Sequence, residues 1–440
     1  MRQTIRKQAA LPPASIKHAK GKELHQVDEI LASHPEAVGL VYLDLTVGVD
    51  AGNGRPGLSA RQALRCSLLK QITQASYRQL AFFLTDSRSY RRFCGFGLGD
   101  ATPSASSLQR TLKKITPQTW EQINRLLVRR ALEEGKESPD RVRGDCTVVP
   151  ANVLRPADSR LLWDSIRTLA SLLAKSKTRF GCDTAQLRKA KRAHTKIFYA
   201  KRKEQRAPAY ADLVQHAEEV AAQARQARRL LVRRVSCWAR SLVEKIDHFL
   251  NLTERVLSQT KRRIFEEEKV PASDKVVSIF EPHTDIVVKS WRETYYGHKI
   301  SLVAGSRLIL DVHVEDGNPC DSILGPRMIE RTLRVTGVAP KQVAFDGGFA
   351  SRPAAEALHE LGVRDVCFSK RRDLSLEELV QCSRRTYDRL RKFRAGIEGL
   401  ISFLKRALGL RCCTWSGRES FDAFVWSGVV AANLLILARL

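Results

Sequence analysis

The segment Val142-Arg-Gly-Asp-Cys-Thr-Val-Val149 has the composition of a buried β-strand, yet it carries an aspartate, Asp145, at its centre. A second apolar strand, Gln342-Val-Ala-Phe345, runs directly into Asp346 and two glycines. A carboxylate in such a place is costly to bury unless a partner or a metal ion compensates its charge. The two glycines let the backbone come close to a ligand. If the strands are neighbours in one sheet, the two carboxylates meet, so the pair predicts an acidic site on a sheet.

A third acidic residue lies in the segment 393–406, Phe-Arg-Ala-Gly-Ile-Glu-Gly-Leu-Ile-Ser-Phe-Leu-Lys-Arg. If this segment is helical, Arg394, Glu398 and Lys405 share one face, and the carboxylate is flanked by cations. Taken alone, an ordinary ion pair between Arg394 and Glu398 is the favoured interpretation. Gly396 and Gly399 each cost a helix about 1 kcal/mol relative to alanine, which predicts a close packing contact or backbone approach at these positions.

The hydrophobic pattern around these segments predicts an α/β layer fold. An antiparallel meander precedes Asp346, and helices alternate with strands around it. Besides 142–149, the predicted strands are 276–280, 286–289, 299–304, 308–314, 342–345 and 365–368, and the predicted helices are 322–335, 353–361 and the helical stretch 375–440.

Residues 57–135 read as a compact set of short helices. Ser59-Ala-Arg-Gln62 predicts a capping box at a helix start, and Thr102-Pro103 predicts the opening of a later helix. Two interpretations of this region are equally supported: a helix-turn-helix module with its last helix in a DNA groove, or a helical bundle with a solvated basic face. The basic residues of that last helix are Arg110, Lys113 and Lys114.

Residues 161–268 form a long helical and basic region after the first strand. Apolar residues from Leu213 to Leu242, including Val235 and Trp238, recur in steps of three, four and seven, as in a coiled-coil seam. The pattern is compatible with a helical hairpin that packs on itself or on a second subunit, and with an insertion that clamps DNA. Both interpretations can hold at once.

The charge of the chain indicates a polyanionic partner. Its 75 Lys and Arg residues exceed its 47 Asp and Glu residues, and the net charge is +28. Nucleic acid is the favoured partner, although a generic basic protein has the same charge, and the spread of basic residues argues against a membrane surface. The ten cysteines show no zinc-finger spacing. The basic start, residues 1–7, is not followed by the apolar segment of a signal peptide, and no apolar run, 424–440 included, reaches bilayer length. We therefore expect a cytoplasmic protein.

Three motifs in order resemble the DDE transposases of bacterial insertion sequences: the strand Asp145-Cys-Thr-Val-Val, the strand ending in Asp346-Gly-Gly-Phe, and the spacing Arg394-x3-Glu398-x6-Lys405. The branch that the chain is similar to carries a Tyr-Arg-Glu-Lys signature around its glutamate and is of the ISNCY type. Arg391 stands at the tyrosine position of that signature, and Tyr387 lies one helical turn earlier as a candidate substitute.

The resemblance implies an RNase H-like catalytic fold, with the first aspartate on the first strand, the second after the fourth, and the glutamate on a late helix. It also implies a catalytic triad of Asp145, Asp346 and Glu398 that binds two Mg²⁺ ions, with Mn²⁺ as a substitute, about 3.5–4 Å apart. Hydrolysis at a transposon end then frees a 3′-OH that attacks target DNA. Further implied or suspected contacts with DNA phosphate are Arg394 and Lys405, and more weakly His298 and Lys299, for which a turn hydrogen bond is the alternative.

The expected organisation has three parts: a helical DNA-end-binding domain at 1–136, an RNase H-like domain at 137–160 and 270–440, and a basic helical insertion at 161–269. The expected partner is double-stranded DNA, both transposon ends and target, bound by a homodimer or a larger assembly without any membrane. The leading prediction is a DNA transposase. A catalytically inactive DNA-binding protein, such as a decayed transposase or a repressor, and a nuclease of the same fold are the alternatives.

Overall fold

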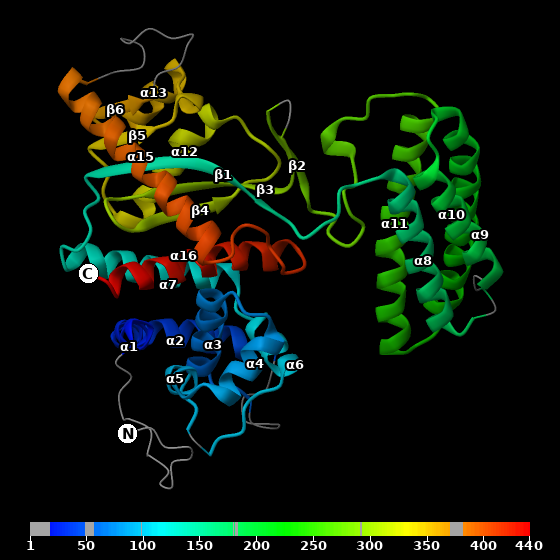
Figure 1. Ribbon diagram of the computed structural model, residues 1–440, viewed down its shortest axis with the longest axis horizontal. Helices are drawn as coiled ribbons and strands as arrows, with labels where there is room; N and C mark the ends of the chain where they lie inside the picture. Colours follow the sequence, from blue (N-terminus) through cyan, green and yellow to red (C-terminus); the bar gives the residue numbers. More distant parts are fainter. Residues whose placement is uncertain are drawn as a thin grey trace, which may run out of the picture.

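A mixed β-sheet forms the centre of the molecule in a computed structural model, which describes residues 18–48, 57–97, 99–178, 180, 184–290, 293–369 and 382–440. The sheet has six strands in the order β2-β3-β1-β5-β6, and β4 also pairs with β3 (Figure 1). The strands are β1 (Arg141–Pro150), β2 (Asp285–Ser290), β3 (Glu293–Ala304), β4 (Ile309–Val314), β5 (Gln342–Phe345) and β6 (Asp365–Phe368).

Strand β1 lies between an antiparallel neighbour, β3, and a parallel neighbour, β5. Its register places Asp145 opposite Leu302 of β3 and Arg143 beside Ala344 of β5. Strand β6 is parallel to β5, while β2 and β4 both pair along β3. The predicted adjacency of the two acidic strands is therefore confirmed. Asp346 follows the fifth strand in the chain, because β2 is an additional short strand that shares β3 with β4.

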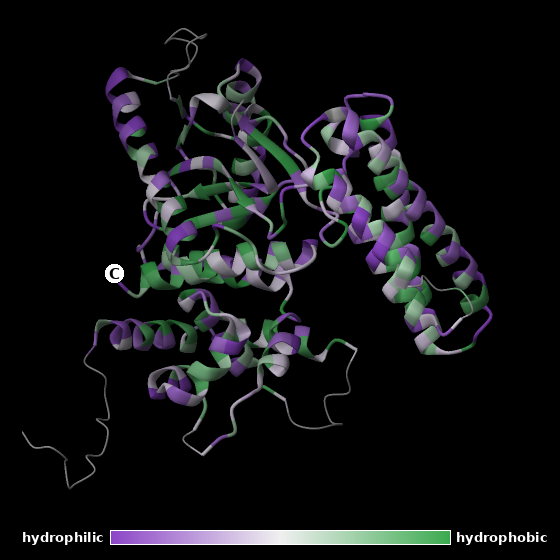
Figure 2. Cartoon of the chain, turned by 45° about the vertical axis from the view of Figure 1, so that its right-hand side comes forward, coloured by the Kyte–Doolittle hydropathy of each residue, from purple (hydrophilic) through white to green (hydrophobic). Residues whose placement is uncertain are grey.

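Helices cover both faces of the sheet. On one face α12 (Asp321–Thr336) packs over β1, β3 and β4, and α13 (Arg352–Glu360) packs on β6. Val142, Val303 and Phe345 are buried on this face. On the other face α15 (Arg384–Ala407) crosses β1, β5 and β6, and α16 (Arg418–Leu437) lies beside β4 (Figure 1). The chain is apolar along the strands and along α16, as Figure 2 shows, so the core lies between these layers.

The N-terminal helices share a core with the sheet rather than enclosing a separate one. Helix α7 packs against α16, and α16 also packs on α3 and on β4. One hydrophobic cluster joins Leu64, Leu127, Leu302 and Val430. The helices are α1 (Ala19–Ala32), α2 (Pro35–Thr46), α3 (Ala60–Thr73), α4 (Tyr77–Asp86), α5 (Arg88–Phe93), α6 (Ala105–Leu112) and α7 (Pro117–Glu133).

The helix starts in this region follow local capping chemistry. Ser59 and Gln62 form the predicted capping box, in which the Gln62 N–H donates to Ser59 Oγ and the Ser59 N–H donates to Gln62 Oε1. Helix α6 begins two residues later than Thr102-Pro103 suggests, because the Ser104 hydroxyl accepts the Ser107 N–H and caps it.

Helix α16 is long and apolar enough to cross a membrane by length and composition alone, which corrects the expectation drawn from residues 424–440. Most of its apolar window is buried inside the protein. Phe421, Val425 and Val429 belong to the same cluster as α3 and the sheet. It is therefore described best as a core helix, and its long apolar run is explained by burial on all sides.

The region after β1 forms a bundle of four helices that Figure 1 shows beside the sheet. The helices are α8 (Asp158–Ser176), α9 (Thr184–Tyr199), α10 (Lys203–Val232) and α11 (Cys237–Ile264). Leu213, Val220 and Leu231 of the predicted seam are buried in α10. The seam does not continue to Val235 and Trp238, which are exposed, because the chain turns between α10 and α11.

One predicted strand is wrong. Residues 276–280 form no strand, although Val276, Val277 and Ile279 are buried. The Val276 N–H donates to the side chain of Gln259 in α11 and is therefore satisfied without a strand partner. The segment anchors the end of the bundle, and its apolar residues reflect that packing. Of the predicted helical stretch 375–440, residues 375–381 lie outside the described residues, as do residues 1–7.

Candidate active site

The site is built on the face of β1 that is turned toward α15. Alternate residues of a strand share a face, and Arg143, Asp145 and Thr147 each contact α15. The Arg143 guanidinium donates to Phe393 O at 2.8 Å and lies 4.6 Å from the centre of the Phe393 ring. Arg141 stacks on the same ring at 4.4 Å. These contacts fix α15 across β1 and bring its charged face to Asp145.

The three predicted catalytic carboxylates converge on one guanidinium, that of Arg394. Arg394 Nη2 lies 3.8 Å from Asp145 Oδ2 and 3.4 Å from Asp346 Oδ1. Arg394 Nη1 lies 3.3 Å from Glu398 Oε1. Residues more than 250 positions apart in the chain thus meet at one point. The simple ion pair between Arg394 and Glu398 is present, and it is one part of a larger cluster.

Burial differs sharply among these side chains. The exposed fraction is 14% for Arg394 and 18% for Asp145, but 51% for Asp346 and 68% for Glu398. Burial raises the pKa of Asp145 to about 6, and it outweighs the opposing effects of the Cys146 N–H, which donates to Asp145 Oδ1 at 2.7 Å, and of Arg394. The charge of Asp145 is therefore only partly compensated in this arrangement.

Gly396 and Gly399 have different roles. A Cβ atom on Gly396 would lie 2.1 Å from Arg143 Nη1, so the absence of a side chain there lets Arg143 reach the backbone of α15. A Cβ atom on Gly399 would meet nothing within 4 Å. The predicted close approach is therefore confirmed at Gly396 and wrong at Gly399.

Lys405 reaches the same strand from the far end of α15. Its Nζ donates to Thr147 Oγ1 at 2.7 Å, and burial lowers its pKa. Thr147 has the same parity on β1 as Asp145, and this is the signal in the sequence that could have identified it. The structure thus brings Arg394 and Lys405 together with the three carboxylates along one strand.

His298 and Lys299 lie inside the protein, which corrects the idea that they face DNA. His298 is fully buried, with Nδ1 2.7 Å from Asp285 Oδ2. Lys299 Nζ donates to Pro319 O at 2.7 Å and pairs with Asp321 Oδ1 at 2.5 Å. Both residues follow the turn from β2 into the buried half of β3, where side chains on either face are covered.

Asp321 is a fourth carboxylate beside the site. It opens α12. Burial is the main cause of the raised pKa of Cys146 and of Asp145, and the charge of Asp321 adds to both. A Cβ atom on Gly348, in the turn after Asp346, would lie 3.1 Å from Asp321 Oδ2. Only the tertiary fold brings the start of α12 to this turn, so no local sequence pattern marks Asp321.

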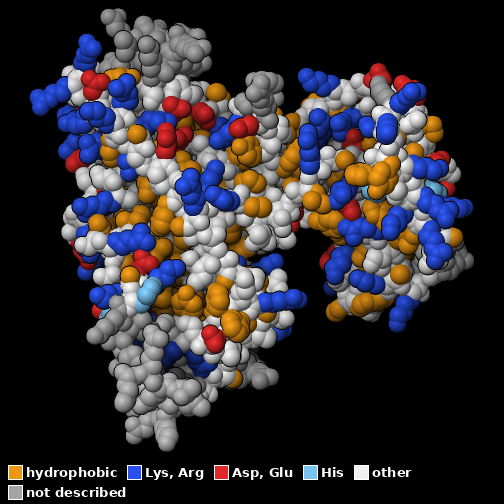
Figure 3. Space-filling model, in the orientation of Figure 1, with side chains coloured by type: hydrophobic (Ala, Val, Ile, Leu, Met, Phe, Trp, Pro, Cys, Tyr) orange, Lys and Arg blue, Asp and Glu red, His pale blue; other side chains and the backbone are white. Residues whose placement is uncertain are grey.

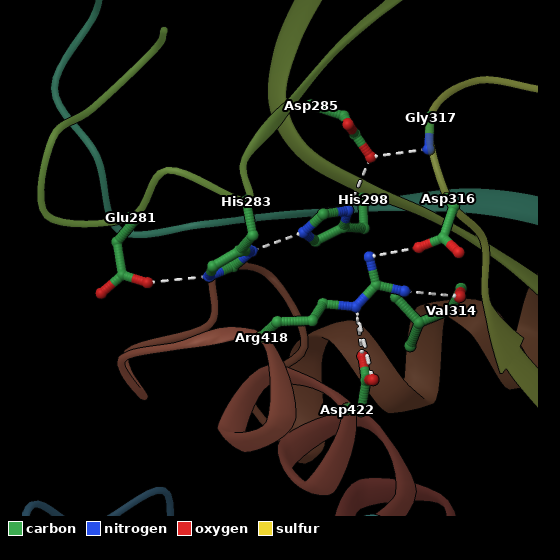
Figure 4. Close-up of polar contacts among 9 residues, drawn as sticks. All are labelled: Glu281, His283, Asp285, His298, Val314, Asp316, Gly317, Arg418 and Asp422. Carbon is green, nitrogen blue, oxygen red and sulfur yellow. Dashed lines mark hydrogen bonds and ion pairs between the residues drawn. The ribbon is translucent and has the colours of Figure 1, made fainter. Parts of the chain in front are cut away.

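A series of four polar side chains, two of them histidines, is centred on His283 and on His298 of β3, as Figure 4 shows. His283 Nε2 is 2.8 Å from Glu281 Oε2, His283 Nδ1 is 2.7 Å from His298 Nε2, and Asp285 closes the chain. Which ring nitrogen donates at each contact depends on the tautomer of the histidine. The four side chains together form one continuous hydrogen-bonded series.

This chain joins three parts of the molecule. Glu281 and His283 lie on the return from the bundle, His298 lies on β3 opposite Val149 of β1, and the Gly417 N–H at the start of α16 donates to Glu281 at 2.9 Å. Figure 4 also shows Arg418, which pairs with Asp316 and Asp422. This series of hydrogen bonds therefore connects the bundle, the sheet and α16.

The remaining predicted residues lie away from the triad. Arg110, Lys113 and Lys114 are exposed at the end of α6 and just beyond it, and Lys114 Nζ donates to Leu45 O at 3.4 Å. Tyr387 is buried beside Leu390 in α15, and burial raises its pKa, so it forms part of the core. Arg391, at the signature's tyrosine position, is exposed.

The donor atoms of the site suit a hard divalent cation, since Mg²⁺ and Mn²⁺ prefer carboxylate oxygens. Asp145 also carries a buried charge that lacks full compensation. The side chains are not yet spaced for a metal ion, because no group of three acidic, histidine or cysteine side chains among the described residues is close enough together to hold one. The carboxylates are instead arranged around Arg394.

Two family models of transposases match the chain. A family model described as "Transposase domain (DUF772)" matches residues 17–114, which hold α1 to α6. A second, described as "Transposase DDE domain", matches residues 287–434, which hold Asp346 and Glu398. The match starts after β1 and the bundle, so it does not include Asp145.

Curated relatives add little about activity. A protein of Rhizobium meliloti described as "Uncharacterized protein ORF8 in nfe locus" is 31% identical over 121 residues, which is 26% of this chain. This chain spans 58% of the length of that relative. No solved structure matches the chain. The two family models match separate parts of the chain, each less than half of it, and together they support a DDE transposase of an insertion sequence.

Proposed function

We propose that this transposase cuts DNA at the terminal inverted repeats of its element and joins the freed 3′-OH ends to target DNA. The observation that carries the proposal is the convergence of Asp145, Asp346 and Glu398 on one point within the matched family's fold. We assign the affiliation within the family to the ISNCY-type branch on the Arg394-Glu398-Lys405 spacing alone.

The three carboxylates would hold two Mg²⁺ ions, or Mn²⁺, and these would stabilise negative charge on the attacking and leaving oxygens. The protein itself supplies positioning. Arg394 offers a planar fork of donors to phosphate oxygens, and Lys405 places a second cation two residues along β1 from Asp145. Arg141 and Arg143 hold α15 in place through Phe393 and thereby set the distance between Glu398 and the two aspartates.

Double-stranded DNA is the proposed partner, bound by a dimer or a larger assembly on the nucleoid. Lys and Arg side chains are spread over the face in Figure 3, and they also occur on the bundle. Helix α9 is distinctive, because it has no acidic residue and its basic side chains form no ion pair among the described residues. Those exposed side chains are Arg188, Lys189, Lys191, Arg192 and Lys196.

The test uses the purified full chain and a labelled duplex that carries the element's own end. In Mg²⁺ or Mn²⁺ we expect a cut that leaves a 3′-OH, followed by joined products when target DNA is added, and no cut in EDTA. Tight binding without any cut in either metal would favour a DNA-binding repressor. Cutting without joining would favour a nuclease.

A further inference from the structure

Arg394 is the one basic side chain that the described ion pairs place against all three catalytic carboxylates. Its two terminal nitrogens contact different carboxylates: Nη2 lies near Asp145 and Asp346, and Nη1 lies near Glu398. Lys405, the other cation along β1, is engaged with Thr147 instead. The charge balance of the acidic cluster therefore depends on this single guanidinium.

The Arg394 guanidinium is largely buried, and the carboxylates of the triad are its charged neighbours. Its side chain is 14% exposed, and its buried Nε has no hydrogen-bond partner among the described residues. Asp346 and Glu398, in contrast, are at least half exposed. A ligand that arrives from solvent can therefore reach these two carboxylates, which lie 3.4 and 3.3 Å from the terminal nitrogens of Arg394.

A guanidinium and a divalent cation compete for these oxygens, because each is bound by the same carboxylates. The terminal nitrogens of Arg394 contact all three carboxylates, so a metal ion that binds all three would take the place of the guanidinium. A DNA phosphate offers the displaced guanidinium a planar pair of acceptors of similar geometry to a carboxylate.

We propose that Arg394 is the resident counter-ion of the metal-free site, and that a DNA phosphate draws it away from the carboxylates as the metal binds. This inference rests on the proposed function, because it takes the triad as the metal site. Its consequence is coupling: DNA raises the affinity for the metal, and by reciprocity the metal raises the affinity for DNA.

The test measures Mn²⁺ binding by the full chain without DNA, by titration calorimetry and by thermal unfolding. Arg394→Gln removes the competitor, so we expect Mn²⁺ affinity to rise about 10- to 100-fold, the equivalent of one charge-assisted hydrogen bond. In EDTA the same variant should unfold at a lower temperature than the parent, because three carboxylates lose their cation. Arg391→Gln, an exposed charge on the same helix, should change neither quantity.

If Arg394 is the counter-ion, Arg394→Gln raises the Mn²⁺ affinity and lowers the unfolding temperature in EDTA. Loss of a merely structural residue would lower both. Arg394→Lys keeps the charge with one nitrogen in place of two, and we expect it to lie between parent and glutamine variant. If either folded variant binds Mn²⁺ no more tightly than the parent, the counter-ion proposal is wrong while the metal site stands. If parent and variants all fail to bind Mn²⁺, the metal site and this inference fail together, whereas cleavage at the element end is tested separately.

Discussion

At the scale of single residues, two glycines in α15 offer a matched pair. Gly396→Ala should destabilise the protein by about 1–3 kcal/mol, because the new methyl group displaces the buried Arg143 guanidinium. Gly399→Ala should be neutral or stabilise by about 1 kcal/mol, since the position is open and alanine favours a helix. Urea unfolding of both variants checks the pair. Equal effects at the two positions would mean that Arg143 does not depend on the gap at Gly396.

Asp145 should make metal-free stability depend on pH. Its folded pKa of about 6 lies above the value of about 3.9 for an unfolded chain. The folded state therefore binds more protons between these values, and stability falls as the pH rises through them. Asp145→Asn should thus be more stable than the parent by about 1–3 kcal/mol at pH 7.5 in EDTA, with the difference vanishing below about pH 4. A less stable variant at pH 7.5 would show that pairing with Arg394 outweighs burial.

Much of the candidate site follows from residue patterns, for a physical reason. Asp145 and Asp346 are conspicuous because an unpaired charge is costly in an apolar strand, and parity along β1 extends the pattern to Thr147. Glu398 needed the family resemblance, since an ordinary ion pair with Arg394 accounts for its local sequence. Asp321 and the convergence on Arg394 depend on contacts between distant segments, which local patterns do not encode.

At the scale of elements, the histidine chain that links the bundle to β3 should respond to acid. Burial lowers the pKa of His283, helped by the charge of its neighbour His298 and of Arg418, against the opposing effect of Glu281. The unfolded state then binds more protons than the folded state below about pH 6.5, so stability falls as the pH falls through this range. His283→Gln should reduce this slope by up to about 1.4 kcal/mol per pH unit.

The measurement is urea unfolding from pH 5 to pH 7.5, with His25→Gln, an exposed histidine of α1, as the control. An unchanged slope in His283→Gln would assign the acid sensitivity to other groups.

The predicted strands are confirmed where a short apolar segment is buried in the sheet, as at β5 and β6. The pattern failed at residues 276–280, because an apolar segment can be buried against a helix side chain without any strand partner.

At the scale of the whole molecule, the basic residues of the bundle fall into two groups, those in ion pairs and those of α9. Arg225, Arg228 and Lys261 are paired with acids of the bundle, whereas the basic residues of α9 form no ion pair with any residue that the structure describes. Changing Lys189, Lys191 and Arg192 to Gln should weaken binding to a generic duplex and lower the slope of log affinity against log salt by about 2 to 3.

Fluorescence anisotropy over a salt series checks this, with the paired residues Arg225, Arg228 and Lys261 changed to Gln as a charge-matched control. Equal losses in both triple variants would mean that net charge, and not α9, governs binding. The sequence predicts a basic surface on the bundle but does not show which part of it binds DNA, because basic pairs occur along the whole region. The structure distinguishes the basic residues that form ion pairs from those of α9.

The structure also shows that the N-terminal helices share their core with α16, which no local pattern in the sequence indicates.

The most direct test of the transposase assignment is cleavage of the labelled element end by Asp145→Asn, Asp346→Asn and Glu398→Gln in Mg²⁺ and Mn²⁺. Asp316→Asn, an exposed carboxylate paired with Arg418, is the control. We expect each triad variant to bind DNA yet lose cleavage by about 10³-fold or more, as when a main catalytic charge is removed, and the control to cut as the parent does. Parental cleavage by any folded triad variant would contradict the assignment of that residue.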